Sequence, residues 1–261
     1  MKRSRNLNNK RDFGLMGARN FSELSKKNTP GNASGESEGV RYVDSAITSR
    51  RAIRSFTSDL VPRETIEEIL SVSSRAPSGS NMQPWRVYVV SGNIKLRLTK
   101  SIVESETGAT KKGRQSWKYY PDVFPPEYNE RRRKIGWDLY DLAGIKKGDR
   151  EGSKRFRNRN FDFFGAPVGF IFTIAEELEV GSWLDYGCFL QNIMIAARGR
   201  GLHTCPQAIF AEVPGPIRKT LSIPKGEIIV CGMSLGYIDE AADVNKLETE
   251  RSTIDEFTKF I

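Results

Sequence analysis

Three arginines within five positions are the most distinctive cluster of functional groups in this sequence. The guanidinium groups of Arg50, Arg51 and Arg54 can each bind two phosphate oxygens at once. The turn 77–81, Pro-Ser-Gly-Ser-Asn, exposes backbone N–H groups and short hydroxyl groups, which also hold phosphate or carbonyl oxygens. Neither segment fits a Walker loop or the dinucleotide glycine pattern, and each alone is as readily a charged surface turn. What the two segments share is a capacity to bind phosphate.

Few other residues could do acid–base or metal chemistry. The single histidine, His203, excludes most zinc sites and leaves one candidate base for a serine or cysteine triad. We expect His203 and Cys205 to be packed rather than catalytic, because nothing nearby in the sequence supports either role. The other cysteines are Cys188 and Cys231, and so few cysteines argue against a disulfide framework, from which we expect a reducing compartment, the cytoplasm. We predict no metal site.

Composition limits the class of protein. The 261 residues are 38% hydrophobic and 10% aromatic, which is enough for a sizeable core in one domain. No apolar run is long enough to predict a membrane span. The net charge of +9 is concentrated in the segments 1–40 and 111–160. The run 131–134, Arg-Arg-Arg-Lys, is typical of a solvated helix face, but interleaved aromatic residues leave a nucleic-acid-binding protein as an alternative of a different class.

Turn-forming residues and hydrophobic periodicity divide the chain into segments. Residues 1–40 read as a flexible basic tail, in which an organelle-targeting role stays open, and 41–261 as the folded domain. An insertion at about 105–160 is long enough to act as a lid, in which Trp117, Tyr120 and Trp137 either stack on substrate or pack the lid. The patterns predict helices near 43–47, 62–75, 94–103, 126–142, 182–198 (capped by Ser182) and 216–221, and strands at 86–90, 168–174 and 227–231. This mixture indicates an α+β domain.

The two phosphate-binding segments, 49–56 and 76–86, together resemble the nitroreductase family of flavin mononucleotide (FMN) enzymes. The resemblance continues through 160–167, 201–208 and 229–237, and it covers about residues 40–261. It implies an α+β nitroreductase-like fold, with a central mixed or antiparallel sheet flanked by helices, and a homodimer with FMN at the subunit boundary.

The resemblance also implies a reaction. NAD(P)H would reduce FMN, and a small-molecule acceptor such as a nitroaromatic or a quinone would then take the electrons by ping-pong hydride transfer. Because the flavin carries the redox chemistry, no catalytic side chain is needed. A flavin enzyme of the same fold with another reductive chemistry, such as dehalogenation, is the nearest alternative.

Cofactor-binding residues follow from the matched motifs. Arg50 and Arg251 match phosphate ligands, and Arg54 matches a cation at the pyrimidine edge of the flavin. The family's cation near Arg251 is replaced here by Thr249 and Glu250. The other matched positions are Arg51 and Ala52 at the ribityl or phosphate group, Pro77, Ser78, Gly79 and Asn81 in a loop from the partner subunit, Pro206, Gln207, Ala208 and Ile209 facing flavin N5, and Gly232 and Gly236 in a late turn near the phosphate side.

Overall fold

The computed structural model describes residues 38–107 and 117–261, with the side chains of 106 and 107 left out. The predicted tail 1–40 therefore falls almost wholly outside the described residues. Residues 42–261 form one compact unit. Its helices and strands, together with the helix that leads into it, are α2 (Glu38–Ser49), α3 (Arg63–Ser73), η1 (Gly79–Asn81), β1 (Arg86–Ser91), α4 (Gly92–Thr107), α5 (Pro126–Leu142), α6 (Arg150–Asn158), η2 (Arg159–Gly165), β2 (Val168–Ala175), α7 (Val180–Arg198), β3 (His203–Gln207), η3 (Ala208–Glu212), α8 (Pro214–Leu221), β4 (Glu227–Gly236), η4 (Asp243–Lys246) and α9 (Ile254–Phe257).

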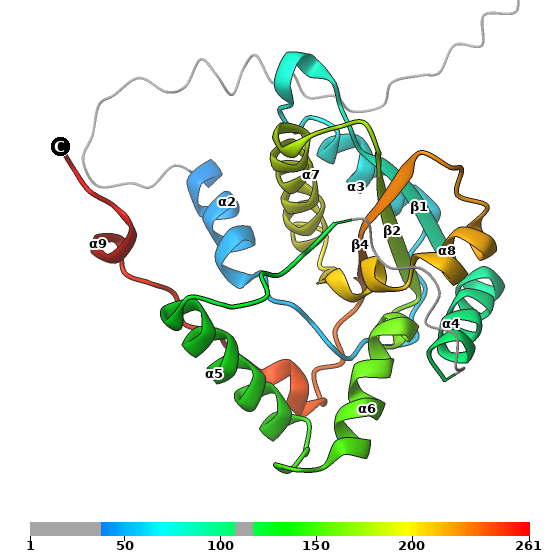
Figure 1. Ribbon diagram of the computed structural model, residues 1–261. Helices are drawn as coiled ribbons and strands as arrows, with labels where there is room; N and C mark the ends of the chain where they lie inside the picture. Colours follow the sequence, from blue (N-terminus) through cyan, green and yellow to red (C-terminus); the bar gives the residue numbers. More distant parts are fainter. Residues whose placement is uncertain (1–37, 108–116) are drawn as a thin grey trace, which may run out of the picture. The chain divides into compact units, whose positions relative to one another are not determined.

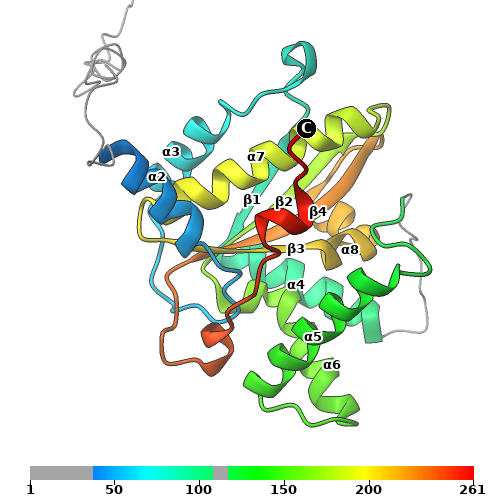
Figure 2. The same cartoon turned by 90° about the vertical axis from the view of Figure 1, so that its left-hand side faces the viewer.

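A four-stranded antiparallel sheet in the order β1-β2-β4-β3 forms the centre of this unit (Figure 1). The central strand β2 is buried along nearly its whole length, which requires cover on both faces of the sheet. Its Phe170 and Phe172 pack with α3 and α7, whereas Ile171 between them packs with α4 and α8. Helices on the two faces can be followed in Figure 2. The layers thus follow the two-residue alternation of β2.

Most predicted elements are present, and some differ in an instructive way. The helix predicted over 126–142 coincides with α5, which has Pro126 in its first turn. Ser182 does not cap α7, because the helix begins two residues earlier and buries Ser182 within its first turn. The segment 201–208, expected as a loop, contains the edge strand β3. The late turn expected at Gly232 and Gly236 is absent at these two positions, because both glycines belong to strand β4.

No helix in the described part of the chain is long and apolar enough to cross a membrane.

Candidate functional site

The arginine-rich segment lies along the free edge of strand β3. Ala52 forms an isolated parallel bridge with Thr204, and the Ile53 amide donates to the Thr204 carbonyl at 3.1 Å. Ile53 is fully buried, so it anchors the segment in the core. The arginines on either side are thereby fixed beside β3, one strand away from the centre of the sheet.

Arg50, Arg54 and Arg251 gather in this region although they come from opposite ends of the sequence. The pKa of Arg50 is lowered, first by partial burial and then by the positive charge of Arg251. Burial raises the pKa of Cys205 to about 11, while the charges of Arg54 and Arg50 act on the same thiol in the opposite direction. Within residues 38–107 and 117–261, no carboxylate forms an ion pair with Arg50, Arg54 or Arg251. A cation cluster without its own counter-ion is suited to bind an anion.

Arg51 points to a different set of neighbours. It makes a long contact of 3.9 Å with the exposed carboxylate of Glu248 and lies near His203. The pKa of His203 is lowered to about 4, mainly by burial and then by the charges of Arg198 and Arg51. This imidazole is therefore neutral at pH 7. Its Nε2 contacts the Arg198 guanidinium at 3.1 Å, and its buried Nδ1 has no hydrogen-bond partner among the residues that the structure describes. Nothing in this geometry provides a catalytic base.

The segment that carries Arg251 forms an ion pair with the insertion. Lys134 of α5 contacts Asp138 at 2.9 Å and Glu250 at 3.4 Å. Arg251 Nη1 donates to the carbonyls of Thr249 and Glu250, which keeps the guanidinium close to its own backbone. An acid at position 250 would oppose phosphate binding, and Lys134 offsets part of the charge of Glu250 through this exposed pair.

The predicted loop 77–81 lies elsewhere in the same chain. The Gly79 amide donates to Asp185 Oδ2 at 3.0 Å, in the first half of α7, whereas Arg198 at the end of α7 donates to Ser49 Oγ beside the arginine segment. With a rise of 1.5 Å per residue, the two positions on α7 are about 20 Å apart. In Figure 1 the cyan segment between α3 and β1, which contains η1, lies at the upper end of α7. One subunit therefore does not bring Pro77, Ser78, Gly79 and Asn81 to the arginines, as expected of a loop that serves the partner subunit.

This loop is also unusually constrained. Ser80, Asn81 and Gln83 all have positive φ angles, near +50°, which residues with a side chain rarely adopt. Ser78 Oγ accepts from the Gln83 amide at 3.0 Å, and Asp185 fixes Gly79 from outside. Sequence reasoning missed Asp185, because a single acid in an apolar helix carries no signal of what it holds.

The segment Pro206–Ile209 completes the edge of the sheet next to the arginines. Gln207 is buried, and its side-chain amide is fully engaged: Nε2 donates to the Asn160 carbonyl at 2.8 Å and Oε1 accepts from Ser234 Oγ at 2.9 Å. The other side chains of the segment, the exposed Pro206 and the partly buried Ala208 and Ile209, carry no polar group, so only the backbone offers polar groups to a ligand. This agrees with a role for its N–H groups, which stays a prediction.

Gly232 and Gly236 make close packing contacts. A Cβ on Gly232 would lie 2.4 Å from the Phe210 ring, and a Cβ on Gly236 would lie 2.7 Å from Pro167. Both glycines are buried in β4, opposite Gln207 and His203 of β3. Packing alone explains why these positions lack a side chain, and contact with a cofactor is an additional prediction.

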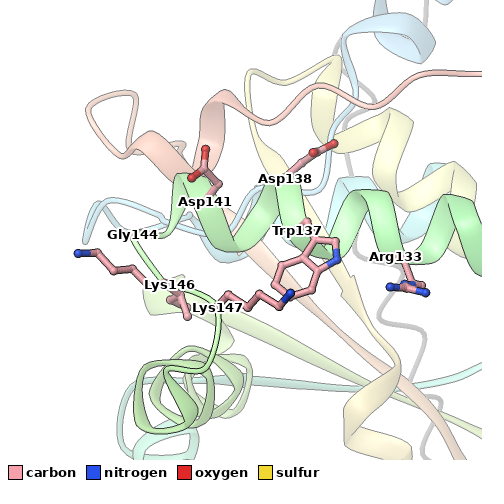
Figure 3. Close-up of a pocket in the computed structure, with 8 residues that line it drawn as sticks. Arg133, Trp137, Asp138, Asp141, Gly144, Lys146 and Lys147 are labelled. Carbon is pink, nitrogen blue, oxygen red and sulfur yellow. The ribbon is translucent and has the colours of Figure 1, made fainter.

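The insertion contains a cavity that lies apart from the arginine cluster. A cavity of about 700 Å³ lies between α5 and the connection to α6, where Lys147 Nζ lies 6.0 Å from the Trp137 ring centroid (Figure 3). None of the predicted FMN residues lines this cavity. The Trp117 ring, by contrast, packs against the Trp183 ring with 4.6 Å between the ring centroids, and Trp117 Nε1 donates to the Ile229 carbonyl at 3.4 Å. Trp117 therefore has a packing role. The described residues contain no cluster of three or more His, Cys, Asp or Glu that could hold a metal.

Comparison with known proteins decides the family. The model of the nitroreductase family matches residues 47–237. The chain belongs to the nitroreductase family. A chloronitrobenzene nitroreductase of Comamonas testosteroni is 41% identical over 84% of this chain and 97% of its own. A 4-nitrobenzoate reductase of Pseudomonas putida is 44% identical over 84% of this chain and 95% of its own.

Solved structures agree with this assignment. The FMN-dependent nitroreductase NfnB from Mycobacterium smegmatis, in complex with NADPH, has a TM-score of 0.81 and 30% identity, covering 86% of this chain and 100% of that one. An FMN- and NADPH-dependent nitroreductase NfnB from sphigopyxis sp. strain HMH also has a TM-score of 0.81, with 29% identity over 84% of this chain and 98% of its own. The predicted family and α+β fold of this nitroreductase are confirmed. The homodimer stays a prediction.

Proposed function

We propose that this nitroreductase takes electrons from NADH or NADPH through bound FMN and passes them to a small nitroaromatic compound. The prediction of an FMN-dependent NAD(P)H oxidoreductase is confirmed at the level of enzyme class and cofactors by the relatives. The nitroaromatic acceptor is proposed because two relatives are named for chloronitrobenzene and 4-nitrobenzoate. Family membership also favours an enzyme over the alternative of a nucleic-acid-binding protein.

The observation that carries the proposal is the cluster of Arg50, Arg54 and Arg251, which forms no ion pair with a carboxylate in the described part of the chain. FMN ends in a phosphate, and guanidinium groups bind phosphate through charge-assisted hydrogen bonds. Arg50 and Arg251 are close enough for the charge of Arg251 to lower the pKa of Arg50, and this repulsion is relieved when an anion lies between them. The residues present therefore fit FMN, with Arg50 and Arg251 at its phosphate and Arg54 at its ring.

Bound FMN would supply the hydride acceptance and donation that the side chains lack. The chain's own contribution is to hold and orient the cofactor and to place positive charge beside it. His203 is neutral, and the two buried cysteines have pKa values raised to about 11 and about 12, so none of the three is suited to transfer protons at pH 7. We propose that both substrates use the same face of the flavin in turn.

The homodimer is part of the proposal. The loop 77–81 and the arginine cluster lie near opposite ends of α7, so a complete site needs the loop of a second copy. An arrangement about a two-fold axis supplies each site with both parts.

Removal of one arginine tests the cofactor site. We expect Arg50→Ala to weaken FMN binding by about 10- to 100-fold, because a hydrogen bond to a charged group contributes about 1.5–3 kcal/mol. Flavin fluorescence during titration of the apoprotein measures the Kd, with Arg97→Ala, an exposed arginine on α4, as the matched control. A wild-type protein that takes up no FMN would refute the proposal.

Steady-state kinetics test the reaction. We expect parallel lines in double-reciprocal plots of NADPH oxidation at several fixed concentrations of 4-nitrobenzoate, as a ping-pong scheme requires. Intersecting lines would refute the shared site. A quinone and a halogenated phenol in the same assay separate nitroreduction from the other acceptor classes that the resemblance left open.

A further inference from the structure

Asn245 is buried and uses its whole side-chain amide. Its Oδ1 accepts from the backbone amides of Arg54 at 2.8 Å and Ser55 at 3.2 Å. Its Nδ2 donates to the carbonyls of Ser55 at 2.8 Å and Asp239 at 2.9 Å. Both acceptor positions and both donor hydrogens of the amide are therefore satisfied, and no other side chain of this size offers two of each.

These bonds fix the backbone of Arg54 from the side opposite β3. The amide of Asp239 donates to the Ser55 carbonyl at 3.1 Å, and Phe56 forms an antiparallel bridge with Ile238. On its other side the segment is tied to β3 through Ile53. Arg54 is thus held between an edge strand and the C-terminal part of the chain, and Asn245 supplies the bonds on the C-terminal side.

Asn245 is also an anchor for Arg251. Val244 and Asn245 are buried, whereas every residue from 246 to 261 is exposed or only partly buried. Beyond Asn245, the ion pair between Lys134 and Glu250 joins two exposed side chains, and such pairs contribute little. The path of the backbone toward Arg251 therefore starts from the bonds of Asn245.

We propose that Asn245 is a positioning residue that assembles the FMN-binding cations from the two ends of the chain. It acts through Arg54, whose backbone it holds directly, and through Arg251, whose segment it anchors. This inference rests on the proposed function, because it assigns Asn245 a role in a cofactor site. A binding site has to hold its groups within about 0.5 Å of the productive geometry, and four bonds from one buried amide provide that restraint.

The experiment compares Asn245→Ala and Asn245→Asp with wild type as holoproteins. The aspartate variant keeps the acceptor for Arg54 but loses both donated bonds, and its similar size keeps the site filled if the alanine variant fails to fold. Asn192→Ala is the matched control, because Asn192 also ties two elements through its amide, at the Ser73 carbonyl on α3, away from the arginines. The measurements are the FMN Kd, the flavin midpoint potential and the melting temperature.

We expect both Asn245 variants to bind FMN at least 10-fold more weakly and to shift the midpoint potential to more negative values. Arg54→Ala should shift the potential in the same direction, because a cation at the pyrimidine edge stabilises the reduced flavin. The double variant Arg54→Ala/Asn245→Ala should show little further shift, since Asn245 acts on the ring through Arg54. Asn192→Ala should lower the melting temperature without changing the potential.

Two results would overturn the assignment of Asn245 alone. One is an FMN Kd and a midpoint potential that equal the wild-type values in both Asn245 variants. The other is a shift of the midpoint potential in the double variant that equals the sum of the shifts in Arg54→Ala and Asn245→Ala. Failure of the wild-type protein to bind FMN would instead refute the proposed function, so the two failures are distinguishable.

Discussion

Gly232→Ala should destabilise the fold by forcing a side chain into a stack of aromatic rings. A Cβ on Gly232 would lie 2.4, 2.8 and 3.0 Å from three carbons of the Phe210 ring. That ring cannot move away freely, because it is fully buried and stacks on Phe163 at 4.7 Å and 24°. The Phe163 ring in turn fills the space above Gly169, where a Cβ would also lie 2.4 Å away. Two glycines of neighbouring strands thus enclose two stacked rings.

The expected cost follows from overpacking a rigid core, which is about 1–3 kcal/mol. For a domain of this size that corresponds to a melting temperature lower by about 2–12 °C. The assay is thermal unfolding at a fixed FMN concentration, because a bound ligand raises the melting temperature by itself. Gly136→Ala, in α5 with nothing within 4 Å of the added Cβ, is the control and should be neutral or slightly stabilising.

A melting temperature of Gly232→Ala within about 1 °C of wild type would refute the packing argument. Phe210→Leu should relieve the contact, so the double variant should lose less stability than the two single variants added together. Loss of FMN binding with an unchanged melting temperature of the apoprotein would instead identify Gly232 as a cofactor contact, which is the role that the family resemblance assigns to it.

Three further measurements test the electrostatics. Burial and neighbouring arginines lower the pKa of His203 to about 4, so between about pH 6.5 and 4 the unfolded chain binds a proton that the folded chain does not. The free energy of unfolding should therefore decrease by about 1–2 kcal/mol, after screening, as the pH falls from about 6.5 to 4. His203→Gln should reduce this decrease. Lys134→Ala should weaken FMN binding by up to about 5-fold, and adding Glu250→Gln should restore it, because the lysine offsets part of the charge of an acid beside Arg251. At pH 8 no more than one thiol per folded chain, that of Cys188, should react with Ellman's reagent, because burial raises the pKa values of the other two.

Each of these has an opposite result that contradicts it. Equal acid sensitivity of wild type and His203→Gln would remove the histidine as the cause. A Lys134 effect that persists with glutamine at position 250 would show a role other than charge neutralisation. The number of reactive thiols per chain is measured in the folded protein and in urea. Rapid reaction of two or three thiols in the folded protein would contradict the burial of these cysteines.

The sequence predicts the local elements of this fold better than the contacts between distant segments. Pro126 in the first turn of α5 and Gly144 just after its last residue, Leu142, mark the limits of this helix within the sequence itself. Strand β3 has no such signal, because its five residues include Pro206, and it is a strand only through pairing with β4. Asn245 holds Arg54 across 191 positions, a link that no local pattern reveals.

The same limit applies to the candidate site. The arginines at 50–54 could be predicted from their type and spacing, and their resemblance to a family extended this to Arg251. That Lys134 offsets part of the charge of Glu250 depends on how α5 lies against the C-terminal segment, which only the folded chain shows. The separation of the loop 77–81 from the arginines likewise depends on the length and direction of α7.

That separation determines how damaged subunits would behave in mixtures. In the proposed dimer, a subunit without Arg50 and a subunit with a defective 77–81 turn are both inactive when paired with themselves. When the two pair with each other, one of the two sites receives an intact arginine cluster and an intact turn, and the other receives neither. Random pairing of equal amounts would therefore restore about a quarter of the normal sites. Two defects on opposite ends of one helix would complement each other, whereas two defects at the same end would not.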